Sequence, residues 1–107
     1  MRPDILRGHV DSLLLATLVS GPGHGYTLSR RLAEGSGGVL EVPEGSLYPA
    51  LHRLEGAGLV DSAWEIEAGR RRRVYRLTRR GRQATAEQRA QWQVFSTAVN
   101  RVFEASA

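Results

Sequence analysis

The stretch "PEGSLYPALHRLEGAGLV", residues 43–60, decides the fold of this chain. When successive residues are set about 100° apart, its apolar side chains gather on one arc and its polar side chains on the opposite arc. The apolar arc consists of Leu47, Ala50, Leu51 and Leu54. The sequence therefore predicts an amphipathic helix with one face in the core, ended by Gly58 in a left-handed conformation.

The polar arc of this helix is a candidate DNA-contacting surface. Its side chains can donate hydrogen bonds to phosphates or to base edges. The members are Ser46, at the boundary of the arc, Tyr48, Pro49, His52 and Arg53. Two alternatives stay open: Tyr48 packs between helices, and His52 and Arg53 are ordinary surface residues.

Pro49 lies inside the predicted helix, where a proline removes one backbone hydrogen bond. If Pro43 caps the helix, the lost bond is the one to the carbonyl of Gly45, which has no side chain and is free to tilt away. We expect a mild bend that angles the first turn toward DNA, rather than the end of the helix.

Two helices and a brief extended segment are predicted before this stretch. Residues 10–20 are apolar around most of a helix circumference, so this helix needs cover on two sides. A glycine-rich connector, residues 21–25, leads to a second helix from Tyr26 to about Glu34, and His24 in the connector is expected to make a local hydrogen bond. The buried side of the second helix is expected to include Tyr26, Leu28, Leu32 and Ala33. Residues 39–42, "VLEV", are predicted to form a short strand.

A hairpin, the wing, is predicted after the helix. Residues 59–66 and 73–78 show the alternation of antiparallel strands. The tip is expected to carry Gly69 and a block of arginines that neutralises phosphates. The block consists of Arg70, Arg71, Arg72 and Arg73. The alternatives are a solvated turn for the block and, for Arg73, a side chain that points along the strand.

A long helix is predicted from Thr78 to the end of the chain. Trp92, Phe95, Val99 and Val102 recur at spacings of 3, 4 and 3, and Phe103 widens this apolar seam. The remaining elements are too small to cover it. We therefore divide the chain into a winged-helix domain, residues 1–78, and a C-terminal dimerisation helix, residues 79–107.

The composition favours a nucleic-acid partner over catalysis. All fifteen basic residues are arginine and the formal net charge is +4, and a planar guanidinium suits phosphates and guanine edges. A GC-rich genome is the alternative cause of the arginine bias. The chain lacks cysteine, its three histidines are scattered, and no paired carboxylates or phosphate-binding glycine loop occur. We therefore expect no enzyme, no cofactor and no metal.

No apolar run approaches the roughly 20 residues that span a bilayer. The first residues, "MRPDILRGHVD", lack the apolar core of a signal peptide. We therefore expect a cytoplasmic protein without a membrane partner.

The predicted order of helix, helix, short strand, helix, strand, strand is that of a winged helix, a mostly helical α+β fold. In this fold the helix before the hairpin enters the major groove and the wing grips the flanking backbone. The alternative is a winged helix that binds protein or RNA, but a protein-binding winged helix has no need of an arginine tip beside a polar helix arc. The pattern favours double-stranded DNA.

The chain resembles the PadR family of bacterial transcriptional regulators. The similar segments are "LLLATLVSGPGHGYTLSRRL" (residues 13–32), "EGSLYPALHRLEGAGLV" (residues 44–60) and "GRRRRVYRLTRRGR" (residues 69–82). Its length is similar to that of the short subgroup, which ends in one C-terminal helix. The family often carries lysine or mixed basic residues at the wing, whereas this chain carries only arginine there.

The resemblance implies a homodimeric repressor on a pseudo-palindromic operator, relieved by a ligand or a stress signal. In such a dimer the C-terminal helix packs on the partner's N-terminal helix. The interface residues are then expected to be Leu14, Leu18, Trp92, Phe95, Val99, Val102 and Phe103. The resemblance further implies a small aromatic effector stacked on Trp92, with Phe95 and Leu14 completing the pocket. The alternative is that these side chains only fill the interface.

Overall fold

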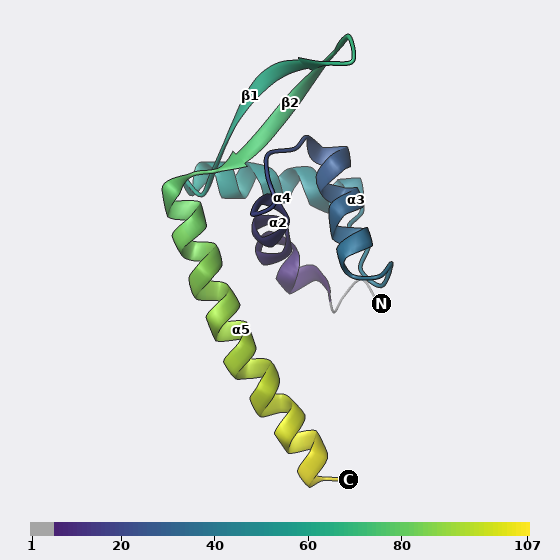
Figure 1. The fold of residues 1–107 in the computed structure, drawn as a ribbon, viewed down its shortest axis with the longest axis vertical. Coiled ribbons are helices and arrows are strands. Elements are labelled where there is room, and N and C mark those ends of the chain that lie inside the picture. The colour runs from purple at the N-terminus through teal and green to yellow at the C-terminus, as the bar shows by residue number, and fades with distance from the viewer. Residues whose placement is uncertain (1–5) are drawn as a thin grey trace.

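The computed structural model describes residues 6–107 of the chain. A 3-10 helix η1 (Arg7–His9) leads into α2 (Val10–Leu18), α3 (Gly25–Gly35) and α4 (Glu44–Gly56). Strands β1 (Val60–Glu67) and β2 (Arg70–Leu77) follow, and α5 (Arg79–Ala105) completes the chain. Figure 1 shows α2, α3 and α4 packed together, the hairpin beside them, and α5 extending away. The predicted mostly helical α+β winged helix is confirmed.

The core lies where α2, α3 and α4 meet the base of the hairpin. Leu14 and Leu15 of α2, Leu28 of α3 and Leu51 of α4 are fully buried. Burying a leucine side chain contributes about 1.5–3 kcal/mol, so these residues supply much of the stability of the domain. The whole predicted apolar arc of α4 is buried, which confirms the periodicity argument.

Two expectations about α3 and the segment after it are wrong. Tyr26 is 62% exposed, because it lies about 200° around α3 from the buried Leu28 and so faces away from the core. Residues 39–42 form no strand. The connector instead forms an isolated antiparallel bridge to β2: the amide of Gly23 donates to the carbonyl of Tyr75 (3.0 Å), and the amide of Tyr75 donates to the carbonyl of Gly23 (2.9 Å).

The end residues of α4 behave as the sequence predicts. Pro43 is the N-cap, and its carbonyl accepts from the amides of Ser46 (2.9 Å) and Leu47 (3.0 Å). The helix continues through Pro49 to Gly56. Gly58 then adopts a φ of 76°, which allows the next amide to bond back to the end of the helix.

The hairpin turns at Ala68 and Gly69, whose φ angles are 51° and 77°. Two successive positive φ angles are typical of a tight two-residue hairpin turn. The arginine block was expected at this tip, but it forms the first half of β2. The reason is that the two-residue turn lets pairing begin at once, with Glu67 opposite Arg70.

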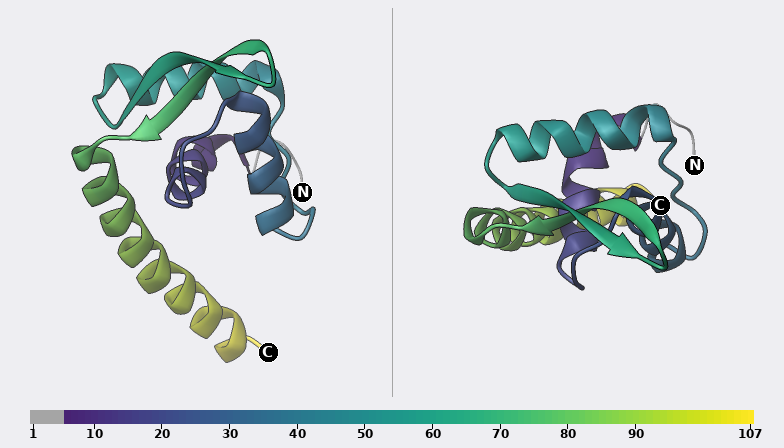
Figure 2. Two further views of the ribbon diagram at one scale, coloured as in Figure 1. Left: turned by 45° about the horizontal axis from the view of Figure 1, so that its top comes forward. Right: turned by 90° about the horizontal axis from the view of Figure 1, so that it is seen from above.

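Helix α5 begins where Thr78 caps it, accepting from the amide of Gly81 (3.0 Å). Its buried residues are Gly81 and Thr85, both near its start. The rest of the helix projects from the domain, as the left view of Figure 2 shows. None of the described helices is long and apolar enough to span a membrane.

Candidate nucleic-acid interface

The outward arc of α4 is open to solvent along its length. Each of the five predicted contact residues is exposed: Ser46, Tyr48, Pro49, His52 and Arg53. These side chains come from successive turns of one helix, so α4 presents them together on one face. The arc therefore has the form of a surface that can enter a groove.

Tyr48 packs between two helices and is also partly exposed, so it has features of both alternatives that the sequence left open. Its hydroxyl end lies against α3, so close that a Cβ added to Gly25 would be 2.6 Å from Oη. The side chain is nevertheless 40% exposed. The glycine at the start of α3 thus lets the two helices approach, and the tyrosine ring fills the contact while keeping an exposed edge.

Arg53 is held by a residue that the sequence did not single out. Its Nη2 donates to Oδ1 of Asp11 on α2 at 2.9 Å. The hydrogen bond and the charge of this carboxylate raise the pKa of the Arg53 guanidinium above its ordinary value. Arg53 therefore presents a fixed rather than a freely moving guanidinium beside the arc of α4.

The four arginines of the block differ in their contacts with the rest of the chain. Arg73 donates through Nε to Oγ of Ser62 (2.9 Å), and its Nη2 lies 3.8 Å from Oε2 of Glu55 on α4. Arg70, Arg71 and Arg72 form no ion pair within residues 6–107. These three cations are uncompensated, as phosphate contacts require, whereas Arg73 ties the wing to α4.

Sequence reasoning missed Trp64 as part of this surface. It lies on β1 directly opposite Arg73 and is 55% exposed. The guanidinium carbons of Arg71 and Arg73 lie 4.8 Å and 5.5 Å from the centre of its ring. The signal that could have found it is an aromatic residue that hairpin pairing places across from a run of arginines.

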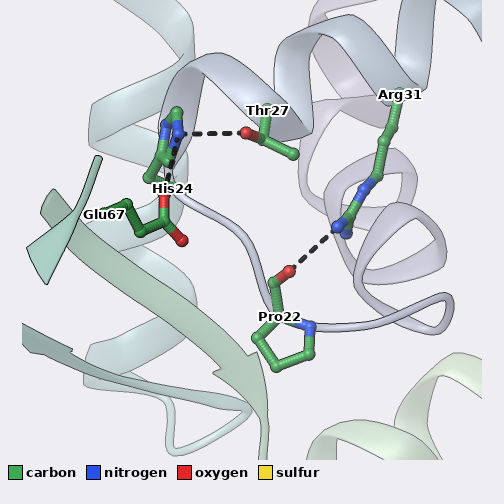
Figure 3. Close-up of polar contacts among 5 residues, drawn as sticks. All are labelled: Pro22, His24, Thr27, Arg31 and Glu67. Carbon is green, nitrogen blue, oxygen red and sulfur yellow. Dashed lines mark hydrogen bonds and ion pairs between the residues drawn. The ribbon is translucent and has the colours of Figure 1, made fainter. Parts of the chain in front are cut away.

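The connector before α3 is braced from two sides (Figure 3). Arg31 donates to the carbonyls of Gly21 (2.7 Å) and Pro22 (2.9 Å). The Nε2 atom of His24 lies 3.1 Å from Oγ1 of Thr27, which confirms the predicted local hydrogen bond.

The same ring nitrogen of His24 lies 3.4 Å from Oε2 of Glu67, at the far end of β1. Figure 3 shows the ring between Thr27 on one side and Glu67 on the other. The far end of the wing is therefore held against the start of α3, whereas Arg73 ties the wing to α4 nearer its base.

The predicted dimer and effector residues fall into two sets. Leu14 and Leu18 are 0% and 3% exposed within the single chain, because α2 packs against α3, α4, α5 and β2. They offer no surface to a partner or a ligand, so the expectation that α2 has a spare apolar face at these residues is wrong. The C-terminal residues form the second set, since Trp92, Phe95, Val102 and Phe103 are more than half exposed, while Val99 is half-buried.

Trp92 makes an aromatic contact that the sequence did not indicate. Its ring lies 5.7 Å from that of His9 in an edge-on arrangement and 6.0 Å from that of Phe95. A groove on the described surface lies between α2 and α3, where Leu13, Thr17 and Leu32 line it. Trp92 and Phe95 thus form a surface cluster in the single chain, and no group of three metal-ligating side chains occurs in the described part.

Comparison with known proteins agrees with this geometry. A model of the transcriptional regulator PadR-like family matches residues 14–87, more than half of the chain. An uncharacterized protein of Lysinibacillus sphaericus is 28% identical over 93 residues, which cover 86% of this chain and 85% of that protein. The transcriptional regulator Rv3488 of Mycobacterium tuberculosis is 46% identical over 66 residues, 62% of this chain and 59% of that protein.

Solved structures extend the similarity to nearly the whole chain. A PadR family transcriptional regulator from Eggerthella lenta superposes with a TM-score of 0.79 at 33% identity, covering 94% of this chain and 87% of that one. A PadR family transcription regulator from Clostridium difficile gives a TM-score of 0.81 at 26% identity, covering 90% of this chain and 99% of that one. The similarity therefore includes both the winged helix and α5.

Proposed function

Because the chain belongs to the transcriptional regulator PadR-like family, and is thus a DNA-binding regulator of transcription, we propose that it is a ligand-responsive repressor acting as a homodimer on a pseudo-palindromic operator. In this proposal α4 enters the major groove and the wing contacts the flanking backbone. A regulator of this kind works in the cytoplasm, where the bacterial chromosome lies.

One observation carries the DNA-binding surface. The exposed polar arc of α4 lies beside a wing whose Arg70, Arg71 and Arg72 have no carboxylate partner in the described part of the chain. Uncompensated cations next to an open polar helix face suit the phosphates and base edges of a duplex. A winged helix that binds protein leaves these three cations without a role.

The dimer is proposed from the apolar stripe on α5. Trp92, Phe95, Val102 and Phe103 are all more than half exposed on a helix that projects from the domain. We propose residues 79–107 as a dimerisation helix appended to a winged-helix domain of residues 1–78. Two such helices, packed around a two-fold axis, would present two copies of α4 about one DNA turn, roughly 34 Å, apart.

The ligand response is proposed from the aromatic cluster at Trp92. Its ring and that of Phe95 lie 6.0 Å apart on the proposed dimerisation helix, where a second copy would complete the walls of a pocket. Leu14 is not part of this pocket, since it is buried in the core. A flat aromatic compound that stacks on Trp92 is the effector class that fits.

The testing experiment measures binding of the full chain to the duplex upstream of its own gene at several salt concentrations. We expect the logarithm of the affinity to fall with the logarithm of salt by about 0.9 per phosphate neutralised. Replacing Arg70 and Arg72 with alanine should weaken binding to all sequences alike and flatten this slope. A flat salt dependence for the parent protein would refute the proposal.

Sedimentation of the same preparation at micromolar concentration tests the dimer. We expect a two-chain species, and a Val102→Asp, Phe103→Asp variant should sediment as a monomer with its winged helix folded. A monomeric parent protein refutes the dimer.

Quenching of Trp92 fluorescence by planar aromatic compounds tests the effector, and no response across a panel of them refutes it.

A further inference from the structure

Trp64 is a large aromatic residue that lies exposed on the wing. Arg71 and Arg73 lie on the same face of β2, and both guanidinium groups lie over the Trp64 ring. Their central carbons are 4.8 Å (Arg71) and 5.5 Å (Arg73) from the centre of the ring. Both distances lie within the roughly 6 Å over which a ring attracts a cation. The ring is thus engaged by two arginines that differ in their other contacts.

Arg73 is anchored to α4. Its Nε donates to Ser62 (2.9 Å), whose hydroxyl in turn donates to Oε2 of Glu55 (2.8 Å). The guanidinium of Arg73 also lies 3.8 Å from that carboxylate. One neighbour of the Trp64 ring is therefore fixed relative to the helix that carries the polar arc.

Arg71 differs because the stack on Trp64 is its one polar or aromatic contact in the described part of the chain. It is exposed and carries a full positive charge without a counter-charge. A free arginine side chain loses much rotamer freedom when it binds a phosphate, and a ring that already holds the guanidinium reduces that loss.

We propose that Trp64 is a positioning residue for DNA binding, which holds Arg71 at a fixed place relative to α4. The chain of contacts runs from Glu55 on α4 through Arg73 and Trp64 to Arg71. It sets the distance between the wing cation and the recognition helix before DNA arrives. This inference rests on the proposed DNA-binding function and deepens it, since it names the wing arginine whose position relative to α4 is fixed before DNA binds.

The test is a double-mutant cycle on affinity for the promoter duplex, measured by fluorescence anisotropy at one salt concentration. Trp64→Ala keeps every arginine, so a loss of affinity cannot come from lost charge. We expect this variant to bind about two- to five-fold more weakly, as an exposed cation–π contact implies. In an Arg71→Ala background, the same replacement should cause no further loss.

Arg72→Ala is the matched control, because this residue lies on the same strand with its side chain on the opposite face and no ring beside it. In that background the loss from Trp64→Ala should persist in full. Trp64→Phe retains an aromatic face and should recover most of the affinity. The salt slope should fall by about 0.9 for Arg71→Ala and stay unchanged for Trp64→Ala. Thermal unfolding of each variant establishes that the fold is retained.

Two results overturn the inference alone: a Trp64→Ala variant that binds as the parent does, or one that loses the same factor with and without Arg71. The second result would mean that the ring touches DNA directly. A parent protein that binds no duplex overturns the proposed function, and the inference falls with it.

Discussion

Arg53 on α4 and Asp11 on α2 form a two-point contact, with Nη2 2.9 Å from Oδ1 and Nε 3.4 Å from Oδ2. The two residues are 42 positions apart in the sequence. An arginine in the proposed recognition surface is therefore oriented by a carboxylate from α2. The contact has consequences for how this surface tells one DNA sequence from another.

Replacing Asp11 with Asn is expected to lower the ratio of operator affinity to affinity for unrelated DNA. The change removes a negative charge near the phosphates, which strengthens non-specific binding. It also frees the Arg53 guanidinium, so the side chain must be ordered again at the base edge that it contacts. Titration of the variant against both duplexes measures the ratio.

Glu34→Gln is the control for Asp11→Asn. It neutralises the carboxylate of another exposed ion pair, that with Arg30 on α3, which does not involve α4. The ratio should stay at the parent value in this variant. If Asp11→Asn also leaves the ratio unchanged, then the contact between α2 and α4 does not orient Arg53 for binding.

Replacing Gly81 with Ala is expected to lower the free energy of unfolding by about 1–3 kcal/mol. A Cβ at this position would overlap the backbone carbonyl of Leu59 and lie 3.2 Å from Cδ2 of Leu77. The start of α5 must then move away from the strands. Urea denaturation followed by circular dichroism measures the change.

Gly56→Ala is the matched control for Gly81→Ala. Gly56 is also helical, and nothing lies within 4 Å of a Cβ added there. The replacement should raise the free energy of unfolding by about 0.4–1 kcal/mol, because it restricts the unfolded chain. Equal effects of the two replacements would mean that α5 does not depend on close approach at Gly81.

Tyr75 is expected to make the protein less stable as the pH rises above about 10. Burial of its ring raises the pKa of Tyr75 above the ordinary value of 10.0, although the charge of Arg73 opposes the shift. The unfolded chain then releases a proton that the folded chain retains, so each step upward in pH favours unfolding until the folded pKa is passed. The contribution of Tyr75 to stability is therefore fully present when the pH is below the pKa of this tyrosine in the unfolded chain.

Comparing urea denaturation at about pH 9 and about pH 11 measures this effect, since arginine stays charged over the range. Tyr75→Phe removes the titrating group and keeps the ring, so its loss of stability between the two values should be smaller than that of the parent. An identical loss in both proteins would assign the pH dependence to other groups.

Local patterns in the sequence were sufficient to predict α4. The buried arc through Leu47 and Leu54 follows from helical spacing alone, and the cap at Gly58 follows from the conformation that only glycine adopts easily. Both features depend on residues within a few positions of each other. The wing was also recognisable, although its turn is shorter than expected.

Contacts between distant elements could not be read from the sequence. Apolar residues around most of α2 indicated two-sided cover, but not that the chain itself buries Leu14 and Leu18. In the same way, the run of arginines did not reveal that Glu55 neutralises Arg73 while Arg71 stacks on Trp64. Which arginine of the run lacks a carboxylate partner depends on how the hairpin is positioned against α4.

Pro49 gives a final test of the arc as a DNA surface. The helix continues through it, and a Cβ at Gly45, whose carbonyl loses its amide donor, would meet nothing within 4 Å. Replacing Pro49 with Ala restores that donor, so the fold should persist and the free energy of unfolding should change little or rise. The affinity for the promoter duplex should change more, because the proline ring lies on the exposed arc. Denaturation and anisotropy on the same preparation compare the two effects, and a loss of stability with unchanged affinity would make Pro49 a structural residue.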